Sequence, residues 1–418
     1  MRANPFHRLL VCYVPAIDLR EVAAGAFPYI GRLLSSYPSV RFRTQPTTDQ
    51  LATLFTGTWP HQHGLWGPRL KPDWQRRVPV QRLVDLLPDI ATTTAQCALH
   101  AMRGPIDLAT MAPRRRRRFD WLRFNIKQLD DVAKVLQPIN GMPSLYTVVG
   151  ARRSRYVYHD DFWDLDRLFD TVGNGDFTLE MVDAHCLDHL QHWNMGNRRR
   201  IREFHRGVDE FVAALHTKSI SRGLGFVVLS DHGMEPVHRV VDLREELRSL
   251  DVSADDYDVF IENTKATLWF HDGAAGARIV AGLRSSDMGT LVKREEMRAY
   301  NLVFDDNRYG DAYFYAGLGH TFFPNDFHQP LASLVRTVSD RQQRRRFRVP
   351  WHQADHGYLP ANDCEIGFMV LAEDGYEALD EFVALIDIAP TLLDLLQLPR
   401  PDSMKGQIAL HRRRAHVA

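Results

Sequence analysis

Short apolar runs alternate with amphipathic stretches along most of the chain, and this order predicts strands that alternate with helices. The apolar runs are rich in β-branched, aliphatic and aromatic residues, which is typical of parallel strands buried on both faces. The predicted strands are His7–Val14, Val40–Arg43, Thr92–Leu99, Tyr156–Tyr158, Phe177–Val182, Gly225–Leu229, Ala266–Phe270 and Gly367–Leu371. The predicted helices are Leu19–Ser36 with a break at Pro28, Leu51–Phe55, Val80–Leu87, Leu129–Leu136, Arg200–Leu215, part of Val237–Leu250, Arg278–Leu283 and Ile386–Leu396. We therefore predict an α/β fold with a doubly wound, mostly parallel central sheet flanked by helices.

Turn residues interrupt this alternation between residues 261 and 328. Asn263, Asp272-Gly273, Asp305–Asn307 and Gly310 break the region into short pieces. We expect a smaller α+β subdomain at 261–328, inserted into a catalytic core formed by 1–260 and 329–418. Ligands of doubly wound sheets bind at the carboxyl ends of the strands, so the loops that follow the predicted strands are the places to look for chemistry.

The stretch QPTTDQLATLFTGTWPHQHG, from Gln45 to Gly64, brings two hydroxyl groups to the start of a predicted helix. Pro46 breaks the preceding element, and Thr47 and Thr48 follow it. Free backbone N–H groups and the positive end of the helix dipole favour a phosphate-like anion at such a place. Two interpretations follow from this stretch alone. Thr47 is a nucleophile, or it only caps the helix, as Thr before a helix commonly does.

Histidine and aspartate gather in a second stretch, LDHLQHW, which follows the predicted strand at 177–182. Asp188 and His192 are four residues apart, so on a helical turn both side chains lie on the same face. Asp with His is a ligand pair suited to zinc or manganese. His185 and His189 lie nearby, and Asp183 is a competing carboxylate. A polar loop is the alternative interpretation.

Two Asp-His-Gly sequences complete the set. SDHGM, with Asp231 and His232, comes directly after the apolar strand GFVVL, where a carboxylate and an imidazole can form a compact metal corner. ADHGYLP comes before the strand at 367–371, and His356 is its expected ligand. Asp355 could instead orient an imidazole from outside the coordination sphere. The alternative interpretation is a polar strand-to-loop turn for SDHGM and an ordinary surface turn for ADHGYLP.

These clusters have a shared explanation in phosphoryl chemistry. A hydroxyl is a weak nucleophile at neutral pH, and a bound divalent ion activates it by stabilising the alkoxide. Two ions about 4 Å apart hold the attacking and leaving oxygens of a displacement at phosphorus. We expect one ion at Asp188, His192 and His356, and a second at Asp231, His232 and Thr47.

Charge and cysteine content narrow the classes of function. The 418 residues include 52 Lys and Arg against 52 Asp and Glu, which gives no argument for binding nucleic acid or a membrane surface. The four Cys lack disulfide-framework or zinc-knuckle spacing, and no apolar run reaches the roughly 18 residues of a membrane helix. We expect a cytoplasmic protein without a membrane span. The run Arg114–Arg118 is interpreted as a solvated loop or helix start, with an anion- or partner-binding patch as the alternative.

The order of these motifs resembles that of the alkaline phosphatase superfamily, and most closely its type I phosphodiesterase/nucleotide pyrophosphatase branch. The resemblance rests on the Thr-containing loop that runs into TG, P and HG, on D-x-x-x-H, on SDHGM and on the late HG. It extends to NTKATLWF at 263–270, NRYGDAYF at 307–314 and IDIAPTLLDLLQLPRPDSMKGQ at 386–407. A sulfatase is disfavoured because a Cys or Ser in a C/S-x-P-x-R pattern is absent from the chain.

The resemblance implies roles for individual residues. Counted back from Thr56-Gly57, the nucleophile of the branch corresponds to Thr47, with Thr48 as the alternative if the loop is shifted by one residue. Gln50 corresponds to an amide that contacts phosphate, and Thr48 is the other residue expected to contact the substrate. The same alignment implies two divalent ions, zinc or manganese, and a small phosphate ester or nucleotide-like substrate.

One departure from the branch concerns the second ion. Its members carry a metal-binding Asp in an Asp-Gly pair directly after the first strand, whereas Pro15 stands at this place and Asp18 follows three residues later. Either Asp18 reaches the ion, or the ion has one carboxylate fewer and binds more weakly. Asp49 replaces the usual Pro after the nucleophile, and its carboxylate could supply the missing ligand or repel an anionic substrate.

The leading hypothesis is a metal-dependent phosphoesterase that hydrolyses a phosphodiester or pyrophosphate bond through a phospho-threonine intermediate. The first alternative is a phosphoryl or phosphoalcohol transferase that uses the same site with an acceptor other than water. The second is a degenerate member of the superfamily that binds a ligand or partner without turnover.

Overall fold

The computed structural model describes residues 6–47, 50–66, 136–328, 337–338 and 341–413. The predicted elements at 80–87 and 92–99, most of the one at 129–136, the run Arg114–Arg118, and residues Thr48 and Asp49 lie outside the described residues. The chain divides into two compact units. Within the described residues, the first unit contains 6–65, 136–235 and 359–413, and the second contains Trp66 and 236–358.

A seven-stranded sheet forms the centre of the first unit, in the order β16-β2-β14-β5-β1-β4-β3. Its strands are β1 (Leu9–Tyr13), β2 (Ser39–Arg43), β3 (Ser154–His159), β4 (Leu179–Ala184), β5 (Gly225–Ser230), β14 (Ile366–Leu371) and β16 (Phe382–Val383). All pairings are parallel except those of β14, which runs antiparallel to both β2 and β5. The predicted doubly wound, mostly parallel α/β sheet is therefore confirmed.

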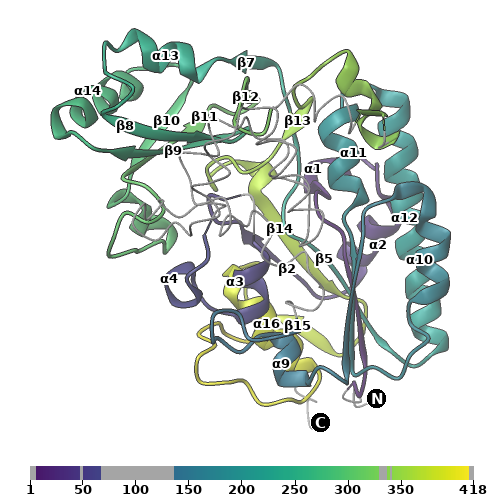
Figure 1. Ribbon diagram of the computed structural model, residues 1–418. Helices are drawn as coiled ribbons and strands as arrows, with labels where there is room; N and C mark the ends of the chain where they lie inside the picture. The colour runs from purple at the N-terminus through teal and green to yellow at the C-terminus, as the bar shows by residue number, and fades with distance from the viewer. Residues whose placement is uncertain (1–5, 48–49, 67–135, 329–336, 339–340, 414–418) are drawn as a thin grey trace, which may run out of the picture. The chain divides into compact units, whose positions relative to one another are not determined.

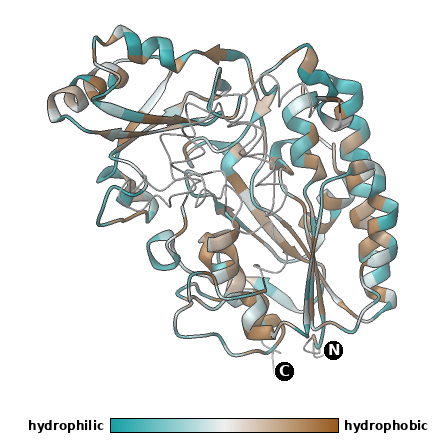
Figure 2. Cartoon of the chain, viewed as in Figure 1, coloured by the Kyte–Doolittle hydropathy of each residue, from teal (hydrophilic) through white to brown (hydrophobic). Residues whose placement is uncertain are grey.

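Helices cover both faces of this sheet, which explains why its strands are apolar almost throughout. Along β1, Leu9, Val11 and Tyr13 pack on one face with α3 (Leu51–Thr56), α9 (Leu145–Val149) and α16 (Ile388–Leu395). Leu10 and Cys12 face the other side, with α2 (Pro28–Ser36), α10 (Leu165–Thr171), α11 (Cys186–Asn194) and α12 (Arg198–Ser221). Figure 1 shows these two helical layers on opposite sides of the sheet. Along α12 the ribbon carries both hydrophobic and hydrophilic colours, as expected for a helix with one buried face (Figure 2).

The break predicted at Pro28 separates two helices, α1 (Leu19–Ala23) and α2. Pro28 is the first residue of α2, where its missing N–H costs no hydrogen bond. The residue before it, Phe27, gives no side-chain cap. Instead the carboxylate of Asp209, on α12, accepts from the backbone N–H groups of Tyr29 and Ile30. A residue that is distant in sequence thus provides the hydrogen-bond acceptor for the backbone N–H groups at the start of this helix.

The remaining elements of the first unit are short. They comprise α4 (Pro60–His63), β15 (Tyr376–Ala378) and β17 (Leu410–Arg412), the last two paired antiparallel, and single turns of 3₁₀-helix. Strand β6 (Glu235–Pro236) lies where the first unit gives way to the second.

The second unit is built around a four-stranded antiparallel sheet in the order β10-β11-β9-β8. These strands are β8 (Tyr257–Ile261), β9 (Lys265–Phe270), β10 (Gly289–Lys293) and β11 (Ala312–Ala316). The unit also contains α13 (Leu243–Ser249), α14 (Gly273–Arg284), β13 (Ala354–Asp355) and the parallel pair β7 (Arg239–Val241) and β12 (His320–Phe322). The segment 261–328 lies within this unit, and its exact limits as a subdomain stay a prediction.

The structure decides two local features that the sequence left open. The His- and Asp-dense segment after β4, for which a polar loop was the alternative, is the helix α11. The direction of the strand at 367–371 was not predicted: β14 is antiparallel to both neighbours, so it begins at the edge where β2 and β5 end. Among the described residues, the structure contains no helix that is both long and apolar enough to cross a membrane.

Candidate active site

Most of the predicted site residues follow strands of the first unit at one edge of its sheet. Asp18 follows β1, Thr47 follows β2, Asp188 and His192 follow β4, and Asp231 and His232 follow β5. Since these four strands run in the same direction, their carboxyl ends share an edge, where ligands bind in doubly wound sheets. The fold therefore brings these loops to the edge that the sequence indicated.

Thr47 lies in the loop between β2 and α3 and is buried, with 2% of its surface exposed. The cap interpretation is wrong, because the N-cap of α3 is Gln50. The helix ends at Thr56, and Gly57 follows with φ of 56° and donates its N–H to the carbonyl of Thr53. Thr56-Gly57 is thus a helix terminus whose left-handed residue favours glycine.

Gln50 braces the loop that carries Thr47. Its side-chain carbonyl accepts from the backbone N–H of Gln45, and its amide donates to the carbonyls of Gln45 (3.0 Å) and Thr47 (2.7 Å). Both amide hydrogens are therefore used within the loop. The expected phosphate contact of Gln50 stays a prediction, and Thr48, the other expected contact, lies outside the described residues.

A chain of buried side chains supports the same loop. Thr53 donates its hydroxyl to the side-chain carbonyl of Gln45 (2.8 Å), and His63 Nε2 lies 3.1 Å from the Thr53 hydroxyl. Because His63 Nδ1 accepts from the N–H of Leu65, the hydrogen of the neutral ring is on Nε2 and donates to Thr53. Burial lowers the pKa of His63 to about 3, which keeps the ring in this neutral form.

We expect this buried imidazole to make the protein sensitive to acid. The pKa of His63 lies below the ordinary 6.5 in the folded chain, so its contribution is fully present above pH 6.5 and is lost as pH falls toward 3. His205, whose pKa burial lowers to about 4, acts in the same direction. The free energy of unfolding of the metal-free protein should fall below pH 6.5, by at most about 1.4 kcal/mol per pH unit for each such histidine.

Unfolding by urea between pH 4 and pH 7.5 measures this effect, with variants that separate its sources. His63→Gln should reduce the slope of stability against pH, while the exposed His7→Gln should keep the wild-type slope. An unchanged slope in His63→Gln would show that His63 is not a source of the acid sensitivity.

Asp231 and His232 form a buried corner directly after β5, with 4% and 3% of their surfaces exposed. Asp231 Oδ1 lies 3.5 Å from His232 Nε2. The hydroxyl of Tyr13, at the end of the neighbouring strand β1, hydrogen-bonds the Asp231 carboxylate. Burial nevertheless raises the pKa of Asp231, because it disfavours the charged form.

The chemistry of this corner fits a divalent cation. Asp231 Oδ1 is buried and accepts no hydrogen bond within the part of the chain that the structure describes. His232 Nδ1 lies 2.8 Å from the carbonyl of Gly233, which requires the hydrogen on Nδ1 and makes Nε2 the nitrogen of the neutral ring that carries the lone pair. A carboxylate oxygen and an imidazole nitrogen are thus both prepared for an ion.

A second group of donors lies on and just before α11. Asp188 Oδ2 is 3.5 Å from His192 Nε2 and 3.6 Å from His185 Nε2. His185, Asp188 and His189 each offer an atom within 4.8 Å of the others, as a metal site requires. His185 is oriented by Asp183, 3.2 Å from its Nδ1. The helix therefore brings Asp188 and His192 together as their spacing predicts, and it adds two neighbouring imidazoles.

Asp183 is buried at the end of β4 and has structural partners. Its Oδ2 accepts from the hydroxyl of Tyr156, on the adjacent strand β3, and its Oδ1 faces His185. Sequence reasoning missed Tyr13 and Tyr156 as partners of the carboxylates. The only sequence signal is an aromatic residue inside each of two neighbouring strands, which is also common in ordinary cores.

Asp18 is buried, and neighbouring groups hydrogen-bond and ion-pair with its carboxylate. It accepts from the backbone N–H of Arg20 (2.8 Å) and forms an ion pair with the Arg20 guanidinium (2.6 Å). Its Oδ2 also accepts from the N–H of Met234. Asp18 is thus beside the SDHGM loop, but its partners are an arginine and a backbone amide. The predicted metal role of Asp18 stays a prediction.

His356 and Asp355 belong to the second unit, in the segment that leads toward β14. The carbonyl of His356 accepts from the hydroxyl of Thr264 (2.8 Å). Asp355 Oδ1 lies 2.6 Å from His352 Nδ1, so this carboxylate orients an imidazole, although the sequence did not single out His352. The expected role of His356 as a metal ligand stays a prediction.

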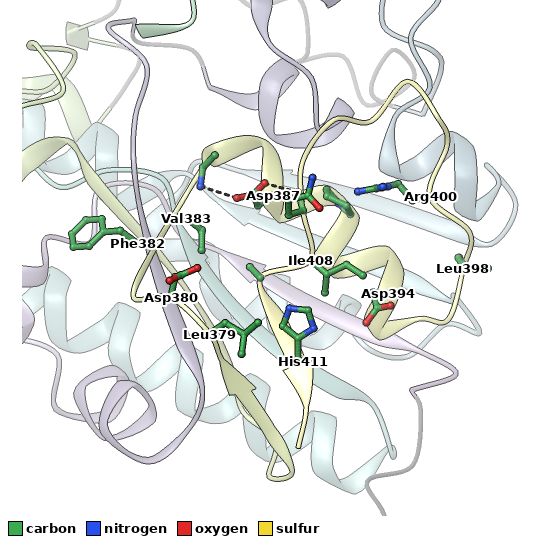
Figure 3. Close-up of a pocket in the computed structure, with 14 residues that line it drawn as sticks. Leu379, Asp380, Phe382, Val383, Asp387, Asp394, Leu398, Arg400, Ile408 and His411 are labelled. Carbon is green, nitrogen blue, oxygen red and sulfur yellow. Dashed lines mark hydrogen bonds between the residues drawn. The ribbon is translucent and has the colours of Figure 1, made fainter. Parts of the chain in front are cut away.

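A cavity of about 690 Å³ lies elsewhere in the first unit, along β16, α16 and the segment before β17 (Figure 3). Its described lining contains none of the predicted site residues. The carboxylate of Asp387 accepts from the N–H groups of Ala384 and Gln407 and so serves the local backbone. Arg400 likewise donates to the carbonyl of Gly406. The cavity therefore lies apart from the predicted chemistry.

Residues 143–361, just over half of the chain, match the family "Type I phosphodiesterase / nucleotide pyrophosphatase". The chain belongs to this family. Its members are hydrolases that act on phosphoric ester bonds and depend on metal ions, as the donor groups after β4 and β5 suggest. No curated protein sequence has a significant match to the chain.

Solved structures agree with this assignment at the level of the fold. Human ectonucleotide pyrophosphatase/phosphodiesterase 5 is 12% identical, with a TM-score of 0.62 over 96% of this chain and 97% of the human one. The murine protein is 12% identical, with a TM-score of 0.60 over 94% and 96% of the two chains. An inactive variant of that murine protein, in complex with AMP, is 13% identical, with a TM-score of 0.59 over 94% and 96%.

Proposed function

We propose that this member of the family hydrolyses a phosphodiester or pyrophosphate bond in a small nucleotide-like substrate, with Thr47 as the nucleophile. One observation carries the proposal: the segments that hold Thr47, Asp188 and Asp231 all follow strands at the carboxyl edge of a single sheet. The complex of the murine relative with AMP supports a nucleotide-like substrate.

The donor groups support binding of divalent ions, zinc or manganese. Asp231 and His232, with Thr47, would hold one ion, and Asp188 with His192 would contribute to the site of the other. The tautomer of His232 favours this assignment, as does the buried Asp231 Oδ1, which accepts no hydrogen bond from the described residues. When bound, the ions supply stabilisation of the Thr47 alkoxide and of negative charge on the phosphate oxygens.

The reaction proceeds in two displacements at phosphorus. The Thr47 Oγ attacks, the bond to the leaving alcohol or phosphate breaks, and a phosphate ester of Thr47 forms. Water then attacks the same phosphorus, the bond to Thr47 breaks, and the product leaves with Thr47 regenerated. Gln50 holds the Thr47 carbonyl, and the chain from Gln45 to His63 fixes the loop, so the hydroxyl is positioned before substrate binds.

The second displacement distinguishes a hydrolase from a transferase. We expect turnover of a chromogenic aryl phosphodiester in H₂¹⁸O to place one ¹⁸O atom in each phosphate monoester product. With added glycerol or ethanol, mass spectrometry should still show the monoester as the main product, because water is the proposed acceptor. Predominant formation of a glyceryl or ethyl phosphodiester would contradict hydrolysis and support the transferase.

A further inference from the structure

Two loops of the first unit are tied together beside the Asp231–His232 corner. The first is 15–20, which follows β1 and includes the start of α1, and the second is 230–235, which begins at the last residue of β5. The N–H of Ile17 donates to the hydroxyl of Ser230 (3.1 Å), and that hydroxyl lies 3.1 Å from the carbonyl of His232. The backbone that carries the corner is therefore held by groups that follow the neighbouring strand.

Asp18 and Arg20 provide the charged contacts between these two loops. The Asp18 carboxylate accepts from the N–H of Met234 (3.3 Å), while Arg20 Nη2 donates to the carbonyl of Met234 (3.1 Å). Arg20 Nη1 also reaches Glu235 (2.8 Å). Together, Asp18 and Arg20 bind both backbone groups of the residue two positions after His232.

The loops approach so closely that a side chain at residue 233 has no room. A Cβ on Gly233 would lie 2.5 Å from Asp18 Oδ2, well inside a van der Waals contact. Gly233 also donates its N–H to the carbonyl of Cys364 (2.7 Å), just before β14. The glycine of SDHGM thus permits Asp18 to lie against the loop.

We propose that Asp18 and Arg20 are positioning residues that hold the Asp231–His232 corner in its metal-binding geometry, and that Asp18 is not itself a ligand. This inference rests on the proposed function, which assigns an ion to that corner. Both Asp18 oxygens accept hydrogen bonds, Oδ1 from the N–H and Nε of Arg20 and Oδ2 from Nη2 and Met234. The guanidinium balances the charge of Asp18, which is 3% exposed.

The decisive measurement is the zinc affinity of the metal-free protein, determined by competition with a chromogenic chelator, together with the number of ions bound per chain. We call the contacts of Asp18 and Arg20 with Met234 the clamp. Arg20→Met removes the part of the clamp that Arg20 supplies but leaves the Asp18 carboxylate available. We expect zinc to bind about 10- to 100-fold more weakly at an unchanged number of ions, as is usual when a supporting group is lost. If Asp18 were a ligand restrained by Arg20, the same change would tighten zinc binding, so the sign of the effect separates the two roles.

Further variants ensure that the test does not depend on the folding of Arg20→Met alone. Asp18→Asn should lower zinc affinity to a similar extent, and the double variant should be no weaker than either single one, because both residues act as a unit. Arg20→Lys, which keeps the charge but not the paired contact, should recover part of the affinity. If Arg20→Met does not fold, Arg20→Lys and Asp18→Asn provide the test instead.

Arg155→Met is the matched control. Arg155 pairs with buried Glu180 (2.9 Å), near the start of β3 and β4 and away from the edge that carries the corner. It should lower the temperature of unfolding without changing zinc affinity. In the clamp variants, kcat for an aryl phosphodiester should fall more than KM changes.

Three results would overturn the positioning role. They are tighter zinc binding in Arg20→Met, the loss of one bound ion in Asp18→Asn, and a clamp variant that loses thermal stability while its zinc affinity and kcat stay at wild-type values. A wild-type chain that binds no ion would overturn the proposed function, and this inference with it. Zinc affinity can be measured in the Thr47→Ala protein even though that protein should be inactive. A failure of the positioning role can therefore be distinguished from a failure of the proposed function.

Discussion

Thr47→Ala is expected to abolish turnover of a chromogenic aryl phosphodiester, with kcat reduced by at least about 10³-fold. The hydroxyl is the only group of Thr47 that can attack phosphorus, and the change to Ala removes it without adding bulk to a buried loop. Gln50 contacts the backbone carbonyl of Thr47, so the bracing of the loop does not depend on the side chain. Bound metal, measured by elemental analysis, should remain.

Thr47→Ser is the matched control, because it keeps a hydroxyl on the same carbon. It should retain measurable turnover, and acid quenching during its reaction or that of the wild type should trap a phosphate ester on the peptide that contains residue 47. Thr47→Ala should show no such adduct. Wild-type activity in Thr47→Ala would exclude Thr47 as the nucleophile and direct attention to Thr48.

Asp231→Asn is expected to separate activity from stability. The side chains have nearly the same shape, but an amide oxygen is a much weaker ligand for zinc or manganese than a carboxylate. We expect the ion at this corner to be lost and kcat to fall by about 10²- to 10³-fold. Titration with zinc and steady-state kinetics measure the two effects.

The metal-free Asp231→Asn protein should be more stable than the metal-free wild type at neutral pH. Burial raises the pKa of Asp231 in the folded chain, so above that pKa the ionised carboxylate opposes folding, and a neutral amide relieves this cost. The stabilisation should therefore vanish as pH falls below the ordinary pKa of Asp, where both states are protonated.

Asp183→Asn is the contrasting variant in the same measurement. Asp183 is as deeply buried, but Tyr156 and His185 occupy its two oxygens, so loss of its charge should destabilise the fold. Thermal unfolding of both variants without metal measures this difference. A carboxylate that binds an ion should be destabilising without the ion, whereas a carboxylate with hydrogen-bond partners should stabilise the fold. Destabilisation by Asp231→Asn together with full activity would contradict a metal site at this corner.

The sequence by itself determined features that depend on neighbours along the chain. Apolar runs such as GFVVL become strands because helices bury both faces of the sheet, and they are recognisable without knowing which helices. The four-residue spacing of Asp188 and His192 places them one helical turn apart, and Asp231 and His232 are covalently adjacent. The break at Pro28 follows from the missing N–H of proline.

Only the tertiary structure decided features that depend on pairing between distant segments. An apolar run is the same in either direction, so the sequence could not show that β14 is antiparallel and begins at the edge that carries the candidate site. Nor could it show that Gln50 is occupied by the loop backbone, since an amide serves a carbonyl and a phosphate equally well. The partner of Asp18 is decided in the same way. A carboxylate binds an ion or a guanidinium with similar chemistry, and here the approach of the loops after β1 and β5 places it against Arg20 and Met234.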